Sequence, residues 1–421
     1  MAAEIESLEA FRARARDFIR ANLHPLDPEA SHSPLRNIGN DETERLGFER
    51  DREIQRMLFD NRLAGICFPT EYGGLGYPPE YQKVFNEEIA GFEYPSRLQA
   101  PTFSPCAAVL LDFGTEEQKQ AHIPAILKGE EIWMQLLSEP SGGSDVAAAL
   151  TTAVRDGDDW ILNGSKVWTT GAWWSDWGLV LARTNWDVPK HRGLTVFMMP
   201  IRAEGVTVHR IEMLNGSKEF CQEFLTDVRV PDSYRIGEVD GGWTVGTRWM
   251  FHERMLLNSA YVTVQGSGGH MDVGAANLAQ LAKEAGRTED PDAHSIVGEV
   301  RMLELVKFEL TARVGQAMRA GAMNDQGAAL SRLFGGVTTS RSYTLAFDLA
   351  GPAGIAWSDD DGELRHTGTD FLMRQSSSIG GGTLEMARNV ISERVLGMPR
   401  ERSHDKDLPF REVPRGAPAQ R

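Results

Sequence analysis

The side-chain pattern of this chain changes character twice, and this change restricts the possible folds more than any single motif does. Residues 1–132 and 242–400 carry apolar side chains at helical spacing, whereas residues 133–241 consist of short β-branched and aromatic runs. Asp156-Gly157 and Asn163-Gly164 separate several of these runs, and both pairs tolerate the positive φ angles of tight hairpin turns. We therefore predict a mainly α protein with a central β domain between two helical domains.

The periodicity is clearest in three places. Leu8, Phe11, Ala15, Phe18 and Ile19 recur at helical spacing near the start, and long helical patterns run over residues 297–318 and 328–350. The last segment, residues 401–421, is instead rich in charge and proline, so we expect it to be poorly ordered.

Charge and cysteine usage exclude several classes of protein. A net charge of −16 argues against a nucleic-acid surface, which needs clustered Lys and Arg. Cys67, Cys106 and Cys221 are odd in number and lack CxxC spacing, so we expect a reducing compartment without disulfides or a zinc site. The ten histidines show no HExxH or paired spacing, so we expect no bound metal. Because the chain has neither a signal-peptide pattern nor a long apolar run, we expect a cytoplasmic protein without a membrane span.

The most specific motif lies at the start of the β region. Residues 137–146 read Leu-Ser-Glu-Pro-Ser-Gly-Gly-Ser-Asp-Val, and residues 163–170 follow with Asn-Gly-x-Lys-x-Trp-x-Thr. Together these stretches resemble the signature of the acyl-CoA dehydrogenases. Shorter matches to the same family lie at residues 68–74, 113–118 and 393–397, in the family's order. Several motifs in one order make coincidence a poor explanation.

This resemblance implies a fold, a cofactor and partners. The family has an N-terminal helical domain, a β-barrel and a C-terminal four-helix bundle, which agrees with the partition above. It implies FAD as the cofactor, an acyl-CoA substrate and an electron-transfer flavoprotein as electron acceptor. It also implies a dimer or tetramer, either a homo-oligomer or a mixed tetramer of related chains.

The first motif is physically suited to hold a flavin. Serine hydroxyls and backbone N–H groups can hydrogen-bond the ring, and small residues let the backbone approach phosphate oxygens. Ser138 alone is equally well explained as a turn residue, and Trp168 alone as a core residue of a strand. By resemblance, the residues that line the FAD are Gln135, Leu137, Ser138, Gly143, Ser144, Trp168 and Thr170. Ser144 also approaches the acyl-CoA.

A second motif, residues 379–385, places glycines before a predicted helix that Thr383 caps, an arrangement that favours anions. By resemblance, Thr383 and Glu385 contact FAD, and Gly381 and Gly382 contact the substrate. Glu385 departs from the family, which commonly has Gln there. Because a carboxylate repels phosphate, we expect Glu385 to point elsewhere.

The position of the catalytic base is a second departure. Many family members carry the catalytic glutamate immediately before the Gly-Thr pair, where this chain has Gly381. A known alternative in the family places it early in the C-terminal domain, just before an arginine, and Glu253-Arg254 stands in the matching place. We therefore predict Glu253 as the base and Arg254 near the substrate. The competing explanations are a solvated helical glutamate and an ion pair within the helix.

Three further features fit the family less closely. Arg287 falls near where the family sends an arginine to the FAD of a neighbouring subunit, and Asp348 replaces a glutamine in a second such segment. Trp173, Trp174 and Trp177 either shape a pocket beside the flavin or fill the β core.

The predicted reaction is the α,β-dehydrogenation of an acyl-CoA to the 2-enoyl-CoA. The resemblance implies that Glu253 removes the Cα proton while flavin N5 accepts a hydride from Cβ. Two alternatives remain: a non-catalytic partner subunit of a mixed acyl-CoA dehydrogenase tetramer, and a flavin oxidase or monooxygenase of the same fold. Gly381, Asp348 and Glu385 favour the partner subunit, whereas Glu253 and the intact first motif oppose it.

Overall fold

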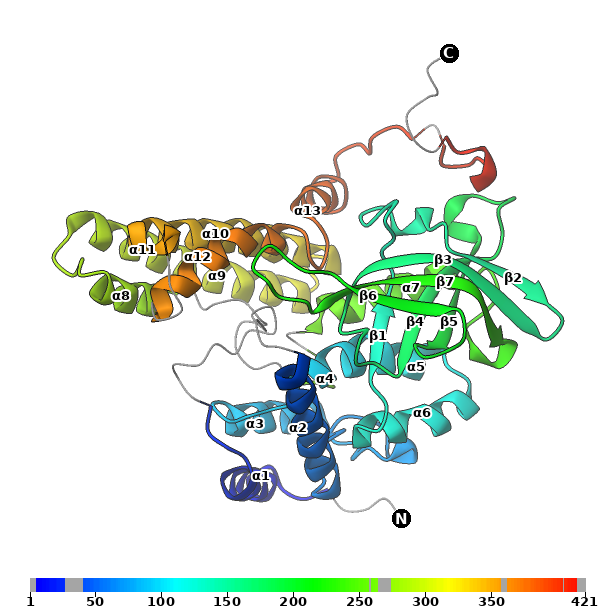
Figure 1. Ribbon diagram of the computed structural model, residues 1–421, viewed down its shortest axis with the longest axis horizontal. Coiled ribbons are helices and arrows are strands. Elements are labelled where there is room, and N and C mark those ends of the chain that lie inside the picture. The colour runs from blue at the N-terminus through cyan, green and yellow to red at the C-terminus, as the bar shows by residue number, and fades with distance from the viewer. Residues whose placement is uncertain are drawn as a thin grey trace. The chain divides into compact units, whose positions relative to one another are not determined.

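The computed structural model describes residues 5–26, 41–256, 259–263, 274–356, 362–403 and 405–414. The chain divides into two compact units, whose elements are labelled in Figure 1. The first unit consists of Met1–Glu212, Ser217–Gly269 and Ser403–Arg421, and the second of Met213–Gly216 and His270–Arg402. None of the helices within the described ranges is both long and apolar enough to cross a membrane.

The first unit begins with short helices that bury one face each. In α1, Ser7 caps the N-terminus, and Phe11, Ala15 and Ile19 form the buried stripe that their spacing predicted. The helices are α1 (Leu8–Asn22), α2 (Asp41–Asp60), α3 (Pro79–Ile89), α4 (Ser96–Pro101), α5 (Ala108–Phe113) and α6 (Glu116–Lys128). A 3-10 turn, η2 (Thr70–Tyr72), follows α2, and a π-helical segment, η3 (Thr102–Ala107), joins α4 to α5.

An eight-stranded sheet follows, in the order β6-β7-β3-β2-β4-β5-β8, with β1 paired in parallel to β4. The strands are β1 (Trp133–Leu136), β2 (Thr152–Asp156), β3 (Asp159–Thr170), β4 (Trp177–Arg183), β5 (Leu194–Pro200), β6 (Val206–Arg210), β7 (Phe220–Pro231) and β8 (Arg235–Ile236). The predicted central β domain is therefore present.

The two predicted hairpin turns have different outcomes. Asp156 pairs with Asp159 across a tight turn in which Gly157 has a φ of +64°, as predicted. The prediction for Asn163-Gly164 is wrong, because this pair lies inside β3, at a shift in its register with β7. A Cβ on Gly164 would lie 2.6 Å from Thr151 Oγ1, so close packing and not a turn requires glycine there.

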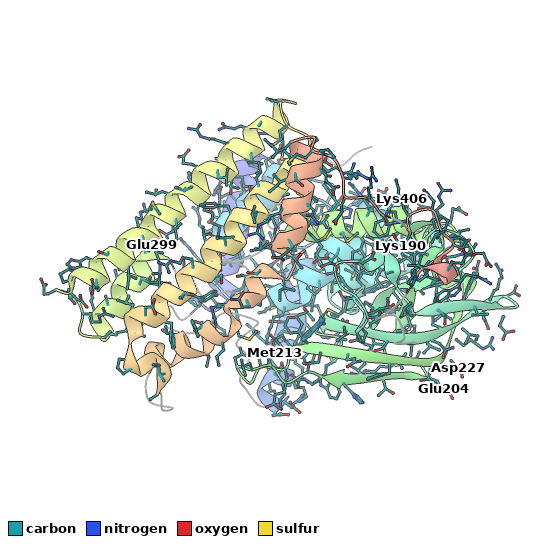
Figure 2. The ribbon with its side chains drawn as sticks, turned by 90° about the horizontal axis from the view of Figure 1, so that it is seen from above. Lys190, Glu204, Met213, Asp227, Glu299 and Lys406 are labelled. Carbon is teal, nitrogen blue, oxygen red and sulfur yellow. The ribbon has the colours of Figure 1, made fainter. Side chains whose placement is uncertain are left out.

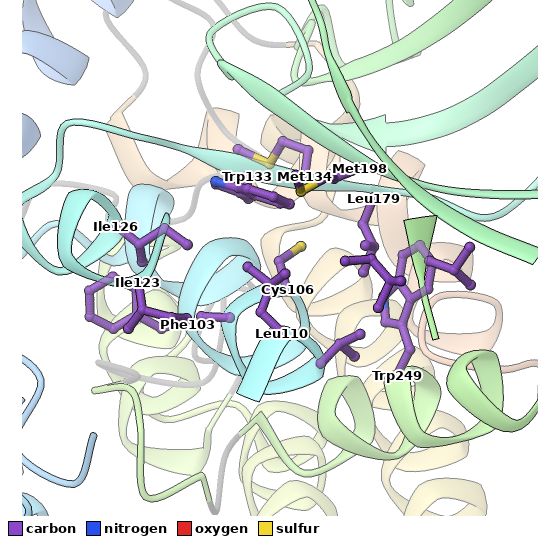
Figure 3. Close-up of a cluster of buried hydrophobic side chains, with 14 of the residues drawn as sticks. Phe103, Cys106, Leu110, Ile123, Ile126, Trp133, Met134, Leu179, Met198 and Trp249 are labelled. Carbon is purple, nitrogen blue, oxygen red and sulfur yellow. The ribbon is translucent and has the colours of Figure 1, made fainter. Parts of the chain in front are cut away.

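The main core of the first unit lies between the sheet and the helices (Figure 3). Trp133, Leu179 and Met198 extend from β1, β4 and β5, and Cys106 belongs to η3. The helix α7 (Gly242–Arg254) adds Trp249, which is fully buried. Because Trp249 and Val245 pack into this core, α7 belongs to the first compact unit. The start of the C-terminal domain at residue 242 stays a prediction.

Part of the C-terminal tail is ordered, which corrects the expectation for residues 405–414. Phe410 is buried, stacks on Trp186 and receives the Arg183 guanidinium on its ring face, 3.8 Å from the ring centroid. The backbone N–H of Phe410 also donates to the carbonyl of Val188 at 2.9 Å. Lys190 and Lys406 accordingly lie on the same side of this unit (Figure 2). An aromatic anchor together with backbone hydrogen bonds to Trp186 and Val188 therefore orders a segment whose composition is otherwise typical of disorder.

The second unit is helical. It contains α8 (Ala275–Glu284), α9 (Pro291–Arg319), α10 (Ala328–Ala350), α11 (Pro352–Ile355), α12 (Gly362–Met373) and α13 (Leu384–Val390), with η9 (Arg374–Ser378) and η10 (Ile391–Val395) between and after the last two. Its core includes Leu278, Val300, Tyr343 and Leu349 from the first three of these helices. The long helical patterns predicted at residues 297–318 and 328–350 are confirmed as α9 and α10.

Candidate active site

The loop after β1 lies directly against β3. The backbone N–H of Val167 donates to the carbonyl of Ser138 at 2.9 Å, and the Lys166 ammonium donates to the carbonyl of Leu137 at 3.2 Å. These bonds join residues 135–144 to residues 166–170. The two stretches that the sequence assigned to one cofactor therefore meet in the fold.

A buried ion pair fixes this junction. The Lys166 ammonium lies 2.8 Å from Glu139 Oε1, and the two side chains are 0% and 4% exposed. Glu139 also accepts hydrogen bonds from the backbone N–H groups of Leu150 and Thr151, at 2.6 Å and 3.0 Å. Burial alone raises the pKa of the Glu139 carboxyl, but the charge and hydrogen bond of Lys166 outweigh burial and hold this pKa below its usual value.

A β-bulge near the C-terminal end of β3 exposes two of its side chains to solvent. Its register with β7 shifts between Val167 and Thr169, and Trp168 adopts a φ of +65°, which is rare for a bulky residue. Trp168 is 55% exposed and Thr170 is exposed, whereas Thr169 points inward and is buried. The bulge therefore presents an indole and a hydroxyl on the outer side.

The polar groups at this surface are free to bind a ligand. Within the described part of the chain, the hydroxyls of Ser138, Ser144 and Thr170 have no hydrogen-bond partner. Gly143 lies beside Ser138, since a Cβ there would be 3.9 Å from Ser138 Oγ. Unpaired hydroxyls next to an exposed indole suit a flat heteroaromatic ring with several hydrogen-bonding atoms. These residues fit FAD.

The predicted base, Glu253, is half-buried on α7. The Trp249 indole N–H donates to Gln135 Oε1 at 2.5 Å, which ties α7 to β1, and Glu253 follows Trp249 by one helical turn on the same face. Burial raises the pKa of the Glu253 carboxyl, and the charge of Arg254 offsets only part of that rise. Burial raises the pKa of the Cys106 thiol on η3, and the negative charge of Glu253 raises it further.

Two properties distinguish Glu253 from a solvated helical glutamate. Its carboxylate has neither a hydrogen bond nor an ion pair among the described residues, and it is desolvated. A half-buried, desolvated carboxylate without a partner costs free energy, and such groups are enriched at functional sites. Arg254 is exposed and forms no ion pair with Glu253 in the described chain.

The end of α7 is held by a cluster that the sequence did not reveal. Asp112 accepts from Arg248 Nε at 2.6 Å and lies 2.8 Å from His252 Nε2. Ser104 Oγ donates to the carbonyl of His252 at 3.1 Å. These bonds fix the residue directly before Glu253. No local motif marks Asp112, because its partners are distant in the sequence.

In the second unit, Arg332 shapes the glycine loop. From α10 its guanidinium donates to the carbonyls of Ser377, Gly380 and Gly382 at 2.9, 2.8 and 3.1 Å. Gly381 and Gly382 have φ angles of +71° and +99°, which glycine adopts without strain. Arg332 and the two glycines thus fix a loop whose backbone a ligand can approach closely. The sequence analysis did not identify Arg332.

The other two predicted residues of the motif at residues 379–385, Thr383 and Glu385, form contacts within α13. Thr383 accepts from the backbone N–H of Met386 at 3.1 Å, so it caps α13 as predicted. Glu385 forms an exposed ion pair with Arg388 at 3.4 Å, along the helix surface.

Arg287 is engaged inside its own unit. It pairs with Asp290 at 2.7 Å and donates to the carbonyls of Asp348 and Leu349 at 3.0 Å and 2.9 Å. The structure thus brings together the two segments that the resemblance assigned to cross-subunit contacts. Any contact of Arg287 with a cofactor has to compete with these bonds.

The three tryptophans have separate roles. Trp177 stacks on Trp133 at a centroid distance of 5.4 Å and packs against the core. Trp174 stacks on Phe48 of α2 at 4.1 Å, and Trp173 is 39% exposed. Trp173 and Trp174 line a cavity of about 540 Å³ with charged residues of α2.

Comparison with known proteins identifies the class to which this fold and site belong. Residues 5–130 match the acyl-CoA dehydrogenase N-terminal domain, and residues 135–228 match the acyl-CoA dehydrogenase middle domain. The chain belongs to the acyl-CoA dehydrogenase family. It is therefore an oxidoreductase that acts on CH–CH groups, with FAD as cofactor.

Particular relatives extend the match over nearly the whole chain. Acyl-CoA dehydrogenase IpdE1 of Mycobacterium tuberculosis is 30% identical over 399 residues, which cover 94% of this chain and 99% of the relative. Acyl-CoA dehydrogenase FadE29 of the same organism is 32% identical over 369 residues, covering 85% and 92%.

Solved structures share the fold. The Tcur3481-Tcur3483 steroid ACAD is 27% identical with a TM-score of 0.70, over 95% of this chain and 100% of that chain. The ChsE4-ChsE5 complex from Mycobacterium tuberculosis is 25% identical with a TM-score of 0.68, over 95% and 100%. The predicted fold class, helical domain, β domain and helical bundle, is confirmed.

Proposed function

We propose that this chain dehydrogenates an acyl-CoA between Cα and Cβ, with Glu253 as the base that takes the Cα proton. The observation that carries this proposal is the desolvated, unpartnered carboxylate of Glu253, on the face of α7 that Trp249 ties to Gln135. An α-proton beside a thioester is weakly acidic, so its removal needs a base with a raised pKa. Bound FAD supplies the acceptor for the hydride that leaves Cβ.

The other residues bind and orient. We assign the FAD contacts of the first unit to Gln135, Leu137, Ser138, Gly143, Ser144, Trp168 and Thr170. In the second unit we assign them to Arg287, Thr383 and Glu385, with the last as the weakest, since its carboxylate already pairs with Arg388. We assign substrate contacts to Ser144, Arg254, Gly381 and Gly382. The N–H of Gly381 can stabilise the developing enolate, because glycine keeps the backbone donor.

A bulky acyl group is the substrate class that we favour. One similar structure is a steroid ACAD, and the family members that carry the base on this helix include enzymes for branched or bulky acyl groups. We further propose an electron-transfer flavoprotein as acceptor and an assembly of two or four chains, because one similar structure is a two-protein complex.

Anaerobic titration of the FAD-loaded protein with a panel of acyl-CoAs tests the reaction directly. Bleaching of the oxidised flavin by at least one bulky acyl-CoA, with formation of the 2-enoyl-CoA, is the expected result. A protein inert to every thioester that nevertheless activates a homologous chain would instead be a non-catalytic partner subunit. Rapid reoxidation by oxygen without any thioester turnover would identify an oxidase.

Ser138→Ala tests the cofactor surface. We expect the variant to fold and bind FAD, while the flavin potential or its rate of reduction changes by the equivalent of about 0.5–1.5 kcal/mol, one hydrogen bond. Stopped-flow reduction and dye-equilibrium potentials measure both. Ser141→Ala, in the same exposed loop, is the matched control. Identical kinetics and potential for Ser138→Ala and the wild type would make Ser138 a turn residue only.

A further inference from the structure

A fully buried carboxylate lies behind the cofactor strand. Glu223 on β7 is 0% exposed, and its Oε2 accepts the Thr169 hydroxyl at 2.8 Å. Its Oε1 has no hydrogen-bond partner in the described part of the chain. A half-satisfied buried carboxylate is costly, and neither the proposed proton transfer nor the proposed FAD contacts make use of Glu223.

The charges around Glu223 leave it without a full counterion. Lys166 on β3 is paired with it in register, but the Lys166 ammonium donates to Glu139 and to the carbonyls of Leu137 and Leu181. The ammonium of Lys166 is thus bonded to Glu139 and acts on Glu223 only through its charge. Burial raises the pKa of Glu223 to about 7, against the opposing effects of Thr169 and Lys166.

The other titratable and charged groups nearby do not compensate. Cys221 lies two residues before Glu223 on β7; burial raises the pKa of its thiol, and the charge of Glu223 adds to that rise. Arg183 on β4 acts on Lys166, and its own guanidinium donates to the carbonyls of Ala147, Ala149 and Lys190. On β6 the residue opposite Glu223 is Val208, which carries no charge.

Thr169 connects this carboxyl to the cofactor surface. It is the inward residue between Trp168 and Thr170, the two outward residues of the bulge. We propose that Glu223 is a positioning residue: through Thr169 it holds the bulge that presents Trp168 and Thr170, and the gain or loss of its proton changes how readily the flavin accepts electrons. This inference rests on the proposed function, in that residues 168–170 line the FAD.

The direction follows from charge. Ionised Glu223 accepts the Thr169 hydrogen bond and places a negative charge behind the flavin, which disfavours the more negative reduced form. Protonated Glu223 removes that charge. The flavin is therefore harder to reduce above the pH at which Glu223 titrates than below it.

The test measures the FAD midpoint potential of the holoprotein against a redox dye, on both sides of pH 7. For the wild type we expect an added inflection near pH 7, where Glu223 titrates. Glu223→Gln should lack this inflection, and above it the ratio of reduced to oxidised flavin at a fixed dye potential should rise on the order of tenfold. Glu219→Gln is the matched control, since Glu219 is a second buried carboxyl, just before β7.

Thr169→Val provides an independent variant. Losing the hydroxyl that lowers the pKa of Glu223 should move the inflection to higher pH. The proposal is overturned if Glu223→Gln keeps the wild-type profile, if Thr169→Val leaves the inflection in place, or if Glu219→Gln removes it. Should Glu223→Gln fail to fold, Thr169→Val still decides. Because no thioester is used, an enzyme inert to acyl-CoA contradicts the proposed reaction without changing this measurement.

Discussion

Glu253→Gln should bind FAD and acyl-CoA normally, yet its flavin should be reduced about 10²–10⁴-fold more slowly, which is the usual contribution of a positioned base. Glutamine keeps the size and hydrogen-bonding capacity of the side chain but cannot accept the proton. Single-turnover reduction by the acyl-CoA that bleaches the wild type measures the effect. Glu309→Gln, at an exposed position on α9, is the control for a neutralised helical glutamate.

The pH dependence gives a second signature of the same base. Because the folded-state pKa of Glu253 is raised, the carboxyl protonates above its ordinary value of 4.5 as the pH falls, and the reduction rate is lost there. Because the pKa of Glu253 is higher in the folded than in the unfolded state, ionising it destabilises the fold as the pH rises above the unfolded-state pKa. At neutral pH the free energy of unfolding of Glu253→Gln should therefore be at least as large as that of the wild type. Wild-type reduction rates in Glu253→Gln would show that the base lies elsewhere.

The backbone at Gly381 disfavours a catalytic glutamate at that position. Its φ of +71° is strained for any residue with a Cβ, although no heavy atom of the described residues lies within 4 Å of where that Cβ would be. A glutamate introduced at residue 381 of the Glu253→Gln variant therefore has space but not the favoured backbone. We expect at most partial restoration of activity, which the same single-turnover measurement detects.

The sequence predicted those parts of the structure that depend on local periodicity. The buried stripe of α1 and the bounds of α10 followed from side-chain spacing, and the turn at Gly157 followed from its local chemistry. The Asn163-Gly164 prediction failed because packing against Thr151, a tertiary contact, decides the role of Gly164. The expectation for the tail failed for the same reason, since residues 405–414 are held by tertiary contacts of Phe410 with Arg183, Trp186 and Val188.

The residues of the candidate site also divide into those that local motifs predicted and those that only tertiary contacts reveal. Residues within continuous motifs, such as Ser138 and Trp168, could be named because the family pattern marks them. Arg332 and Asp112 could not, since each acts through bonds to segments that are remote in sequence. Glu223 carries no motif at all, and only its complete burial beside Thr169 makes it notable.

Lys166→Met should lower the free energy of unfolding by about 3–5 kcal/mol, because it leaves the Glu139 carboxylate buried without its counterion. The carbonyls of Leu137 and Leu181 also lose their donor. Since Leu137 and Ser138 belong to the cofactor loop, FAD should be bound more weakly or lost. Urea unfolding followed by tryptophan fluorescence, with and without added FAD, measures both effects.

Lys190→Met is the matched control, because Lys190 pairs with Asp145 of the same loop at 2.6 Å, but with side chains 19% and 52% exposed. An exposed pair of this kind contributes only about 0–1 kcal/mol. Combining Glu139→Gln with Lys166→Met should recover part of the loss, since the unpaired charge is then gone. The pKa of Glu139 is lowered in the fold, so its stabilisation is present above the unfolded-state pKa and is lost as the pH falls through the folded value. The difference in the free energy of unfolding between Lys166→Met and the wild type should therefore become smaller at acidic pH. Equal decreases in this free energy for Lys166→Met and Lys190→Met at neutral pH would contradict a structural role for the buried pair.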